Sequence, residues 1–409
     1  MTEVIEKTEY KKGYKKTKLG WIPEDWKMVK IKNLTCVKSG STPLRANYNK
    51  YFKDGTIKWV KTLDLNNGVL QDTQEKITDI AIRESSCSIF PKNTVLVAMY
   101  GGFNQIGRTG LMNFDGCINQ ALSAILPNDK FNPVFMLNWL NYNVLEWRNY
   151  AASSRKDPNI TKNDVEKFIV ILPSKQEQKK IAEILSAWDD GIETLEKLIE
   201  QKEILKNSLA QKCFRRKNIL FSLKQHKLGE LFKNRKETNC CDLELLSVCD
   251  GLGIVPRSQL NAKDNSNDNK SKYLKVCIGD LAYNTMRMWQ GRCGVSSYEG
   301  IVSPAYTVCI PKNNIDVDYM YYLFKTPHMI HDFWRYSQGI VDDTLNLKFN
   351  NFEVIKVWIP DKETQTKIAK LLKSYDEEIQ LLNSKLEKLK EQKKGLMQKL
   401  LTGQIRVKI

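Results

Sequence analysis

Two stretches of the sequence carry one pattern: Phe168-Ile-Val-Ile-Leu-Pro-Ser-Lys-Gln-Glu-Gln-Lys-Lys-Ile-Ala-Glu-Ile-Leu185 and Ile355-Lys-Val-Trp-Ile-Pro-Asp-Lys-Glu-Thr-Gln-Thr-Lys-Ile-Ala-Lys-Leu-Leu372. The shift that carries Pro173 onto Pro360, called the repeat shift below, also superimposes the second Gln of the first stretch, the Ile-Ala pair and the final Leu without a gap. The same shift places Leu396, Gln398 and Lys399 on Leu209, Gln211 and Lys212. The sequence therefore predicts an internal repeat, whose unit is an alternating β segment that ends in Pro and a long helix that follows it.

Both predicted helices have recognisable starts. Pro173 and Pro360 are unfavourable inside a helix but compatible with the boundary before one. Ser174 with Glu177 three residues later forms the sequence signature of a capping box, and Asp361 is a good N-cap in the second copy. We therefore expect helices to begin directly after each Pro.

Apolar residues recur along both predicted helices at steps of four and three, a spacing typical of a coiled-coil seam. The seam residues are Ile181, Leu185, Trp188, Ile192, Leu195 and Ile199 in the first helix, and Ile368, Leu372, Tyr375, Ile379, Leu382, Leu386 and Leu389 in the second. Lys202 and Lys206 interrupt the first seam, so we expect less regular packing there. A helix of about 40 residues is a rod of about 60 Å. Two matched rods favour packing against each other; the alternative is that each helix only covers the core of its own domain.

The 409 residues are enough for two or three domains, each with its own core. The 64 Lys and Arg residues exceed the 47 Asp and Glu residues, which gives a net charge of +17. Such a surplus favours a polyanionic partner, because phosphates bind Lys and Arg. The alternative is a Lys-rich proteome in which all surfaces are basic.

The ten Cys residues include no C-x-x-C spacing, and no signal peptide precedes the first predicted strand. This usage indicates reduced thiols and favours the cytoplasm. No apolar run approaches the length that crosses a membrane. We expect a soluble intracellular protein.

The chain is expected to contain two globular segments of mixed strands and helices, each followed by a helical rod. Strand-like runs occur at 57–60, 94–100, 122–126, 281–283 and 305–310, and the final strands of the two segments align when Ala121 is placed on Ala305 and Pro127 on Pro311. The predicted boundaries are an N-terminal arm over 1–20, globular domains over 21–172 and 219–360, a central long helix over 173–218, and a C-terminal long helix and tail over 361–409. A repeated scaffold with divergent loops is typical of two sites of shared design and separate specificity.

Catalytic signatures are missing from the sequence. It has neither a G-x-x-x-x-G-K-[ST] phosphate-binding loop nor an H-E-x-x-H motif. The segment Asp157-Pro158-Asn159-Ile160 lacks the second Pro and the aromatic residue of an amino-methyltransferase clamp. His328 and His331 have no third metal ligand nearby, so we predict no metal site and no catalytic residue. Two other classes of protein remain open: a single-chain DNA nuclease or methyltransferase, and a coiled-coil scaffold that binds only protein.

Two glycine-containing stretches, 100–108 and 289–294, follow predicted strands and combine amide, Arg and aromatic side chains. Asn and Gln can bond an adenine edge, Arg can bond a guanine edge, and Gly lets the backbone approach phosphates. The alternative is that they are ordinary loops. The predicted DNA-binding residues are Lys61, Thr62, Tyr100, Asn104, Gln105 and Arg108 in the first domain, and Arg257, Asn284, Arg287, Trp289, Gln290 and Arg292 in the second.

Taken together, these residues resemble the specificity subunit of Type I DNA restriction–modification systems over essentially the whole chain. The resemblance rests on Leu19-Gly-Trp-Ile-Pro-Glu-Asp-Trp26, Gly300-Ile-Val-Ser-Pro-Ala-Tyr306, the two duplicated helix starts and the final Leu400-Leu-Thr-Gly403. Each motif alone is modest evidence, but their order and duplication are specific.

The resemblance implies an α+β fold in which two long antiparallel coiled-coil helices separate two target-recognition domains related by an internal pseudo-two-fold repeat. Each domain would read one half of an asymmetric, bipartite DNA sequence, and the helices would set the spacer. The subunit would hold no cofactor and would not itself be catalytic. Its implied partners are double-stranded DNA, two modification subunits that methylate adenine N6 with S-adenosylmethionine, and restriction subunits that use ATP and Mg²⁺.

Overall fold

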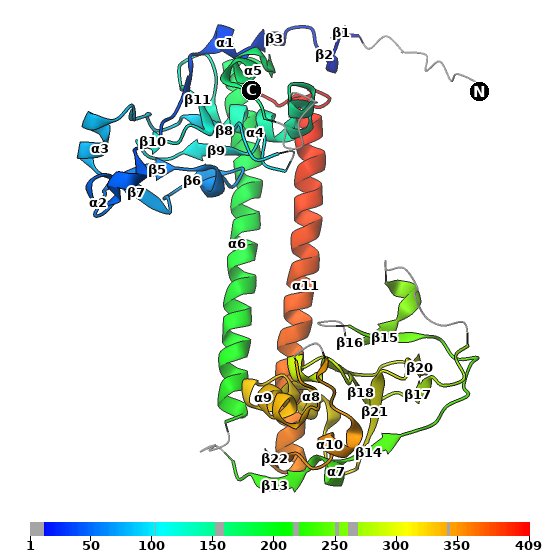
Figure 1. Cartoon of the computed structure of the whole chain (residues 1–409). Helices are drawn as coiled ribbons and strands as arrows, with labels where there is room; N and C mark the ends of the chain where they lie inside the picture. The colour runs from blue at the N-terminus through cyan, green and yellow to red at the C-terminus, as the bar shows by residue number, and fades with distance from the viewer. Residues whose placement is uncertain are drawn as a thin grey trace. The chain divides into compact units, whose positions relative to one another are not determined.

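The structure is a computed structural model that describes residues 12–102, 104–151, 159–215, 221–249, 253–260, 269–341 and 344–409. The chain forms two compact units (Figure 1): unit 1 comprises Met1–Leu195 with Lys385–Ile409, and unit 2 comprises Glu196–Ser384. Residues 1–11 of the predicted N-terminal arm lie outside the described residues. The long helices α6 (Lys175–Cys213) and α11 (Lys362–Leu401) each contribute one part to each unit.

Unit 1 is built around a sheet with the strand order β4-β11-β8-β9-β6, next to a smaller sheet with the order β10-β5-β7. Strands β8, β9 and β11 are buried along their whole length, so they form the centre of the core. Before α6, the elements of unit 1 are β1 (Tyr14–Thr17), β2 (Gly20–Pro23), β3 (Lys27–Lys30), α1 (Ile31–Leu34), β4 (Val37–Ser39), η1 (Arg45–Asn47), α2 (Tyr48–Tyr51), β5 (Ile57–Val60), η2 (Thr62–Asp64), β6 (Val69–Leu70), β7 (Glu75–Ile77), α3 (Asp79–Glu84), β8 (Val95–Ala98), β9 (Thr109–Met112), β10 (Cys117–Ile118), β11 (Leu122–Ile125), α4 (Pro133–Tyr142), η3 (Val144–Asn149), α5 (Lys162–Lys167) and β12 (Ile169–Leu172).

Unit 2 is built around a sheet with the order β14-β21-β18-β19, next to the pairs β15-β16 and β17-β20. Its core gathers the aromatic side chains of α8, α9 and α10 against this sheet. Before α11, its elements are β13 (Lys224–Lys227), α7 (Leu228–Leu231), β14 (Phe232–Arg235), β15 (Leu246–Cys249), β16 (Gly253–Pro256), η4 (Arg257–Gln259), β17 (Leu274–Val276), β18 (Leu281–Asn284), η5 (Met288–Gln290), β19 (Cys293–Val295), β20 (Gly300–Val302), β21 (Tyr306–Pro311), α8 (Val317–Phe324), α9 (Pro327–Tyr336), α10 (Phe349–Phe352) and β22 (Lys356–Ile359).

The two units share one topology, which confirms that the internal repeat reaches into the globular parts. Strands β4, β11, β8 and β9 of unit 1 pair in the same order as β14, β21, β18 and β19 of unit 2. The strand before each long helix pairs antiparallel with an early strand of its own unit, β12 with β3 and β22 with β13. Even single backbone bonds recur: Ile31 N–H donates to Phe168 C=O at 3.0 Å in unit 1, and Leu228 N–H donates to Ile355 C=O at 2.9 Å in unit 2.

The repeated Gln at the start of α6 is buried and uses both ends of its amide. The Gln178 side chain, of which 2% is exposed, donates through Nε2 to Pro173 C=O at 3.0 Å and accepts the Asn132 N–H at 2.8 Å. Asn132 is the N-cap of α4, because its Oδ1 accepts the N–H groups of Val134 and Phe135. One side chain therefore fixes the end of β12 and the start of α4 against the first turn of α6.

Unit 2 repeats this arrangement with Gln365, of which 1% is exposed. Its Nε2 donates to Pro360 C=O at 2.8 Å, and its Oε1 accepts the Asp316 N–H at 3.0 Å. Asp316 is the N-cap of α8, the counterpart of α4. A buried amide that lost either partner would leave a polar group unsatisfied, so the repeated Gln defines the geometry of both helix starts.

The predicted caps are confirmed at both long helices. Ser174 and Glu177 bond reciprocally at 3.4 and 3.3 Å, and Asp361 Oδ1 accepts the Thr364 N–H at 3.0 Å. Glu177 does more than cap, because its 1%-exposed carboxylate also accepts Trp26 Nε1 at 3.2 Å and Arg406 Nε at 2.6 Å. The C-terminal segment thereby becomes part of unit 1.

Arg406 also joins the C-terminal segment to the first strands of the chain. Its two terminal nitrogens donate to Asp25 at 3.0 and 2.8 Å, and this hydrogen bonding holds the pKa of Asp25 below its ordinary value. Tyr14 donates its hydroxyl to Gly403 C=O at 2.7 Å. Leu400 and Leu401 are buried in the same core as Ile22 and Trp26. Unit 1 is therefore completed by residues from the far end of the sequence.

Within each unit the two long helices pair antiparallel through equivalent ion pairs. Lys393 contacts Asp189 in unit 1, and Lys206 contacts Asp376 in unit 2. The repeat shift converts one pair into the other, with the roles of the two helices exchanged. Lys202 adds a contact with Glu378 at 2.8 Å. Exposed pairs of this kind stabilise weakly, but opposite charges at matching positions favour one register.

The two Lys that interrupt the predicted seam of α6 are thus the residues whose ammonium groups contact α11. Around them the seam residues are buried or half-buried along both helices. Within the part of the chain that the structure describes, no helix combines the length and apolar character needed to span a membrane.

Replacing Gln178 with Ala should loosen the start of α4 and the first turn of α6. The substitution leaves Pro173 C=O and Asn132 N–H without their partner, at a cost of about 2–4 kcal/mol. Hydrogen exchange of the full chain, read by mass spectrometry, should be faster in residues 132–142 and 168–185. Gln176→Ala is the matched control, because Gln176 lies exposed in the same helical turn. Equal exchange in the two variants would contradict the role given to Gln178.

Candidate nucleic-acid interface

Most of the predicted site residues lie on two equivalent loops. Residues 99–108 connect β8 to β9, and residues 285–292 connect β18 to β19, so each loop follows the same strand of its own sheet. Gly101, Gly102 and Gly107 have φ of +109°, +70° and +79°, and Gly291 has φ of +74°. These left-handed conformations favour Gly and turn the backbone sharply at the end of the strand. The scaffold therefore presents one polar loop in each unit.

The β8–β9 loop exposes some of its predicted residues and engages others internally. Tyr100 is 45% exposed and Asn104 is exposed, whereas Gln105 and Arg108 are half-buried. The Arg108 guanidinium donates to Gln105 Oε1 at 2.9 Å and to Leu65 C=O at 2.5 Å. Arg108 thus holds this loop against the segment that follows η2, which leaves Tyr100 and Asn104 as the most accessible of its predicted side chains.

Lys61 and Thr62 are brought close to the same loop, because Leu65 N–H bonds to Thr62 C=O at 3.3 Å at the end of η2. Lys61 Nζ lies 3.3 Å from Glu75. Arg45, which the sequence reading did not select, contacts the same Glu75 at 2.6 Å. These two cations hold the pKa of Glu75 below its ordinary value, with the Arg45 hydrogen bond as the larger cause. Two cations share one carboxylate, so this group of three side chains keeps a net positive charge.

The β18–β19 loop brings four predicted residues together with Asn284, the last residue of β18. The backbone folds on itself, since Asn284 N–H donates to Arg292 C=O at 3.2 Å and Arg292 N–H donates to Arg287 C=O at 3.3 Å. Trp289 donates its indole N–H to Met286 C=O at 3.0 Å. Gln290 and Arg292 are exposed, so an amide and a guanidinium extend from a compact turn.

Arg257 lies on a different element. It begins η4 after β16, and its guanidinium donates to Ser247 Oγ of β15 at 3.4 Å. The structure therefore places Arg257 directly after the β15–β16 hairpin, whereas the other predicted residues of unit 2 lie at the end of β18 (Asn284) or on the β18–β19 loop.

Each loop is tied to a segment that the sequence reading did not include in the site. Ile160 N–H donates to Met99 C=O at 2.9 Å in unit 1, and Leu347 N–H donates to Thr285 C=O at 2.8 Å in unit 2. The repeat shift carries Ile160 onto Leu347. That shift could have identified this pair, although nothing in either residue type marks a functional site.

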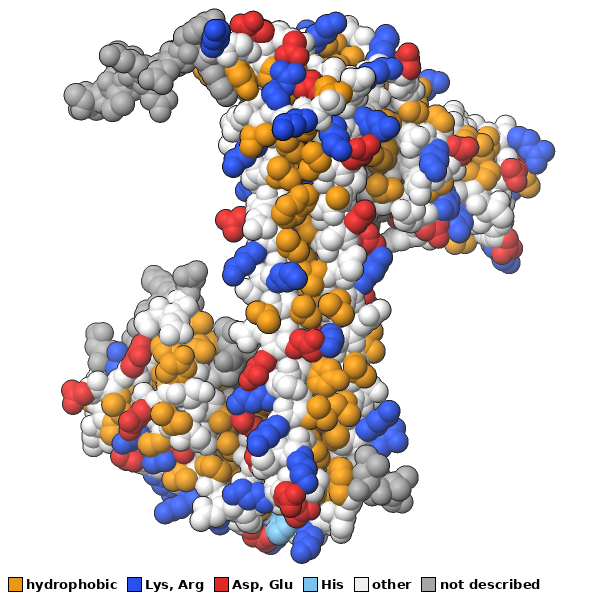
Figure 2. Space-filling model, turned by 180° about the vertical axis from the view of Figure 1, so that it is seen from behind, with side chains coloured by type: hydrophobic (Ala, Val, Ile, Leu, Met, Phe, Trp, Pro, Cys, Tyr) orange, Lys and Arg blue, Asp and Glu red, His pale blue; other side chains and the backbone are white. Residues whose placement is uncertain are grey.

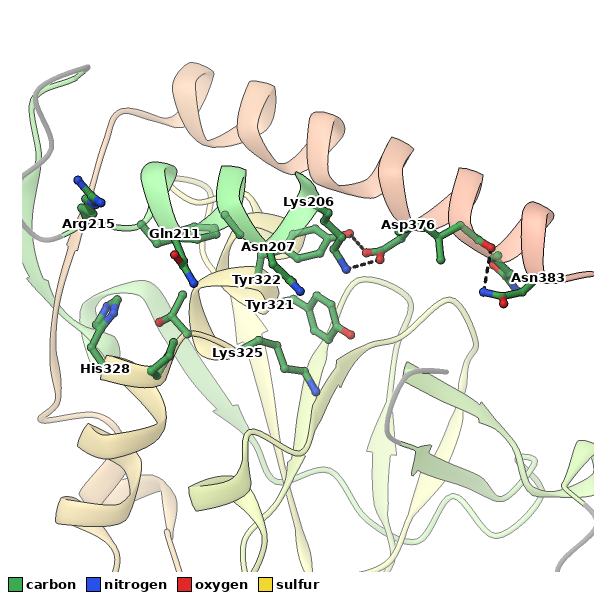
Figure 3. A pocket seen from close by; sticks show the side chains of 16 residues that line it. Lys206, Asn207, Gln211, Arg215, Tyr321, Tyr322, Lys325, His328, Asp376 and Asn383 are labelled. Atoms are coloured by element: carbon green, nitrogen blue, oxygen red, sulfur yellow. Dashed lines mark hydrogen bonds and ion pairs between the residues drawn. The ribbon is translucent and has the colours of Figure 1, made fainter. Parts of the chain in front are cut away.

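A groove of unit 2 lies between the end of α6, the helices α8 and α9, and the start of α11 (Figure 3), with a volume of about 1140 Å³. Its lining residue Lys325 reaches the β18–β19 loop, because Lys325 Cδ lies 3.7 Å from the Cβ position of Gly291. The Asp376 carboxylate accepts hydrogen bonds from Lys206 Nζ and from the Tyr322 hydroxyl, the latter at 2.6 Å. Burial, together with the hydrogen bond to Asp376, raises the pKa of Tyr322 above its ordinary value. Tyr321 and Lys325 extend into the groove from α8 and the residue after it. Its lining mixes aromatic, amide and cationic side chains.

Charged side chains are spread out on the face of the molecule that Figure 2 draws. On the face drawn in Figure 2, basic and acidic side chains are interspersed over both units. The surplus of +17 therefore does not gather into one basic patch on this face. Across the described ranges, no group of three or more His, Cys, Asp or Glu residues is arranged to hold a metal ion.

A family model described as "Type I restriction modification DNA specificity domain" matches residues 23–204 and 254–391. The Type I restriction enzyme MjaIX specificity subunit of Methanocaldococcus jannaschii is 30% identical over 203 residues, which cover 49% of this chain and 45% of that protein. The MjaVIII specificity subunit of the same organism is 24% identical over 422 residues, which cover 95% of this chain and 94% of the relative.

A solved structure extends the similarity to the fold. The crystal structure of a Type I restriction–modification S subunit from M. genitalium covers 92% of this chain and 96% of its own, with a TM-score of 0.61 and 17% identity. At this identity the likeness concerns the fold alone.

Replacing Gly107 with Ala should disrupt the β8–β9 loop. A Cβ atom there would lie 2.1 Å from Cδ1 of Trp147, a buried ring stacked on Phe168 at 4.0 Å, and the backbone has a left-handed φ. The expected cost is about 2–4 kcal/mol from strain and overpacking, seen as faster hydrogen exchange in residues 95–112 of the full chain. Gly20→Ala is the control, because Gly20 has φ of +99° but nothing within 4 Å of its Cβ position. Equal effects of the two substitutions would contradict the packing argument.

Proposed function

We propose, because this chain belongs to the type I restriction modification DNA specificity family, that it is the subunit that recognises the target sequence of a restriction–modification complex. The observation that carries this proposal is the pair of equivalent loops, β8–β9 and β18–β19, at the same position in two repeated scaffolds. Exposed amide, aromatic and guanidinium groups on such loops can bond base edges. The β-strand scaffold holds them in place.

The two units repeat one scaffold but carry different loops, and this combination predicts a bipartite, asymmetric target. The two units share strand order, helix starts and buried Gln clamps, so each is a complete reader. Their loops differ in sequence: Asn104 and Gln105 stand in one, and Gln290 and Arg292 in the other. Because different side chains bond different base edges, the two half-sites should differ. The target is then two unlike half-sites on one DNA duplex.

The chemistry belongs to partner subunits. A specificity subunit works within a complex with other subunits, and we propose that these are two modification subunits and, in the full complex, restriction subunits. The modification subunits would transfer a methyl group from S-adenosylmethionine to adenine N6, and the restriction subunits would use ATP and Mg²⁺. The repeat supports a count of two, because a surface present in both units offers two equivalent places for one partner.

Arg292→Ala should weaken binding to the target duplex by about 1–3 kcal/mol if its guanidinium bonds a guanine edge. It should also relax the base preference at one position of one half-site and leave the other half-site unchanged. The measurement is a binding titration of the complex, with sequencing of methylated sites. Lys356→Ala removes the same charge from an exposed position on β22 and serves as control. Equal weakening on every sequence would instead indicate a phosphate contact.

The assembled complex without restriction subunits should contain one copy of this chain and two modification subunits. Native mass spectrometry of the co-expressed proteins measures this ratio directly. A stable complex with only one modification subunit, unchanged by excess partner, would contradict the argument from repetition.

A further inference from the structure

A hairpin in unit 2 projects an apolar side chain fully into solvent. Its stem is formed by Gln338 and Asn346, which exchange two backbone hydrogen bonds at 2.9 and 2.8 Å. Near its tip, Ile340 is 99% exposed and Val341 is 58% exposed. An aliphatic side chain in this position gains nothing from the fold of its own unit, since burial is what makes apolar side chains stabilising.

The backbone near this tip is held in place. Thr344 Oγ1 accepts the N–H groups of both Ile340 and Val341 at 3.2 Å, and Thr344 N–H donates to Val341 C=O at 2.9 Å. Gly339 has φ of +150°, and a Cβ atom there would lie 2.7 Å from the carbonyl of Thr344. Ile340 and Val341 are therefore held to Thr344 by specific bonds, while the side chain of Ile340 stays in solvent.

The hairpin is anchored to the candidate DNA-binding loop. Leu347, the residue after the stem, is buried and donates its N–H to Thr285 C=O at 2.8 Å. Thr285 is the first residue of the β18–β19 loop, which carries Arg287, Gln290 and Arg292. The helix before the hairpin also touches this loop, because Ile330 of α9 lies 3.3 Å from the Cβ position of Gly291. The hairpin is thus anchored to the β18–β19 loop through a buried backbone bond, and α9 packs against the same loop.

We propose that Ile340 makes an apolar contact with the bases of the half-site read by unit 2, an inference that rests on the proposed function. DNA offers apolar surface in two forms: the thymine methyl group in the major groove, and the faces of a base step opened by an inserted side chain. Phosphates offer no apolar surface. The polar loop supplies hydrogen bonds, and the tip supplies the apolar contact.

The test uses the complex of the full chain with its modification subunits and duplexes carrying the target selected from a random-sequence library. Ile340→Ser should lower affinity for the target by about ten- to a hundredfold, the effect of burying one aliphatic side chain. Affinity for unrelated duplex and the salt dependence of binding should not change. Ile340→Val should retain most of the affinity.

The matched control is Ile278→Ser. Ile278 is 72% exposed in the same unit but precedes β18, whereas the β18–β19 loop follows that strand. This control should bind the target as the wild type does. Equal affinities of Ile340→Ser and wild type would overturn the inference. It would also be overturned if Ile340→Ser weakened assembly with the modification subunits in the absence of DNA, since the tip would then contact protein.

Two further arms identify the apolar surface. Uracil in place of thymine in the half-site should abolish the difference between wild type and Ile340→Ser if the methyl group is contacted. If a base step is opened, the fluorescence of 2-aminopurine placed in the half-site should increase when the wild-type complex binds but not when Ile340→Ser binds. A wild-type complex that selects no sequence from the library would contradict the proposed function itself. If the wild-type complex selects a sequence but Ile340→Ser binds it with unchanged affinity, only this inference is contradicted.

Discussion

The structure depends on one buried side chain that occurs twice. Gln178 and Gln365 each bond the carbonyl of the Pro that ends a strand and the N–H of the residue that caps the next helix of the globular part. Each Gln stands in the first turns of a long helix, so the same amide couples that helix to its globular part. An amide can make these bonds because it donates at one end and accepts at the other.

The function can be inferred from what the two units share and from where they differ. The sheet order, the strand before each long helix and the Lys–Asp pairs between the helices recur in both units. The loops after β8 and β18 occupy the same place but differ in sequence and in internal bonding: Arg108 is held by Gln105 and Leu65, whereas Arg292 is exposed. A repeated frame with two unlike loops suits a protein that reads two unlike sequences.

Much of the scaffold could be predicted because its signals are local and repeated. The repeat shift, the Pro boundaries, the caps and the heptad spacing can all be read from short segments of the sequence. The contact of the C-terminal segment with the rest of unit 1 could not be predicted. Arg406 and Glu177 lie far apart in the sequence, and a single ion pair produces no periodic pattern in it. Lys202 and Lys206 read as interruptions because their acidic partners stand on the other helix. The positions of the two loops could be predicted, because each loop follows a predicted strand. The sequence did not indicate that Arg108 bonds within its own unit, or that the hairpin of Ile340 is bonded to the second loop.

The most direct test of the account is the sequence that the assembled complex methylates. Purified complex of this chain with its modification subunits would be given unmethylated genomic DNA and S-adenosylmethionine, and every methylated adenine would be located by single-molecule sequencing. The account predicts one motif made of two different half-sites separated by a fixed run of unspecified bases. A single uninterrupted motif, or methylation without sequence preference, would contradict the claim that two repeated units each read one half of the target.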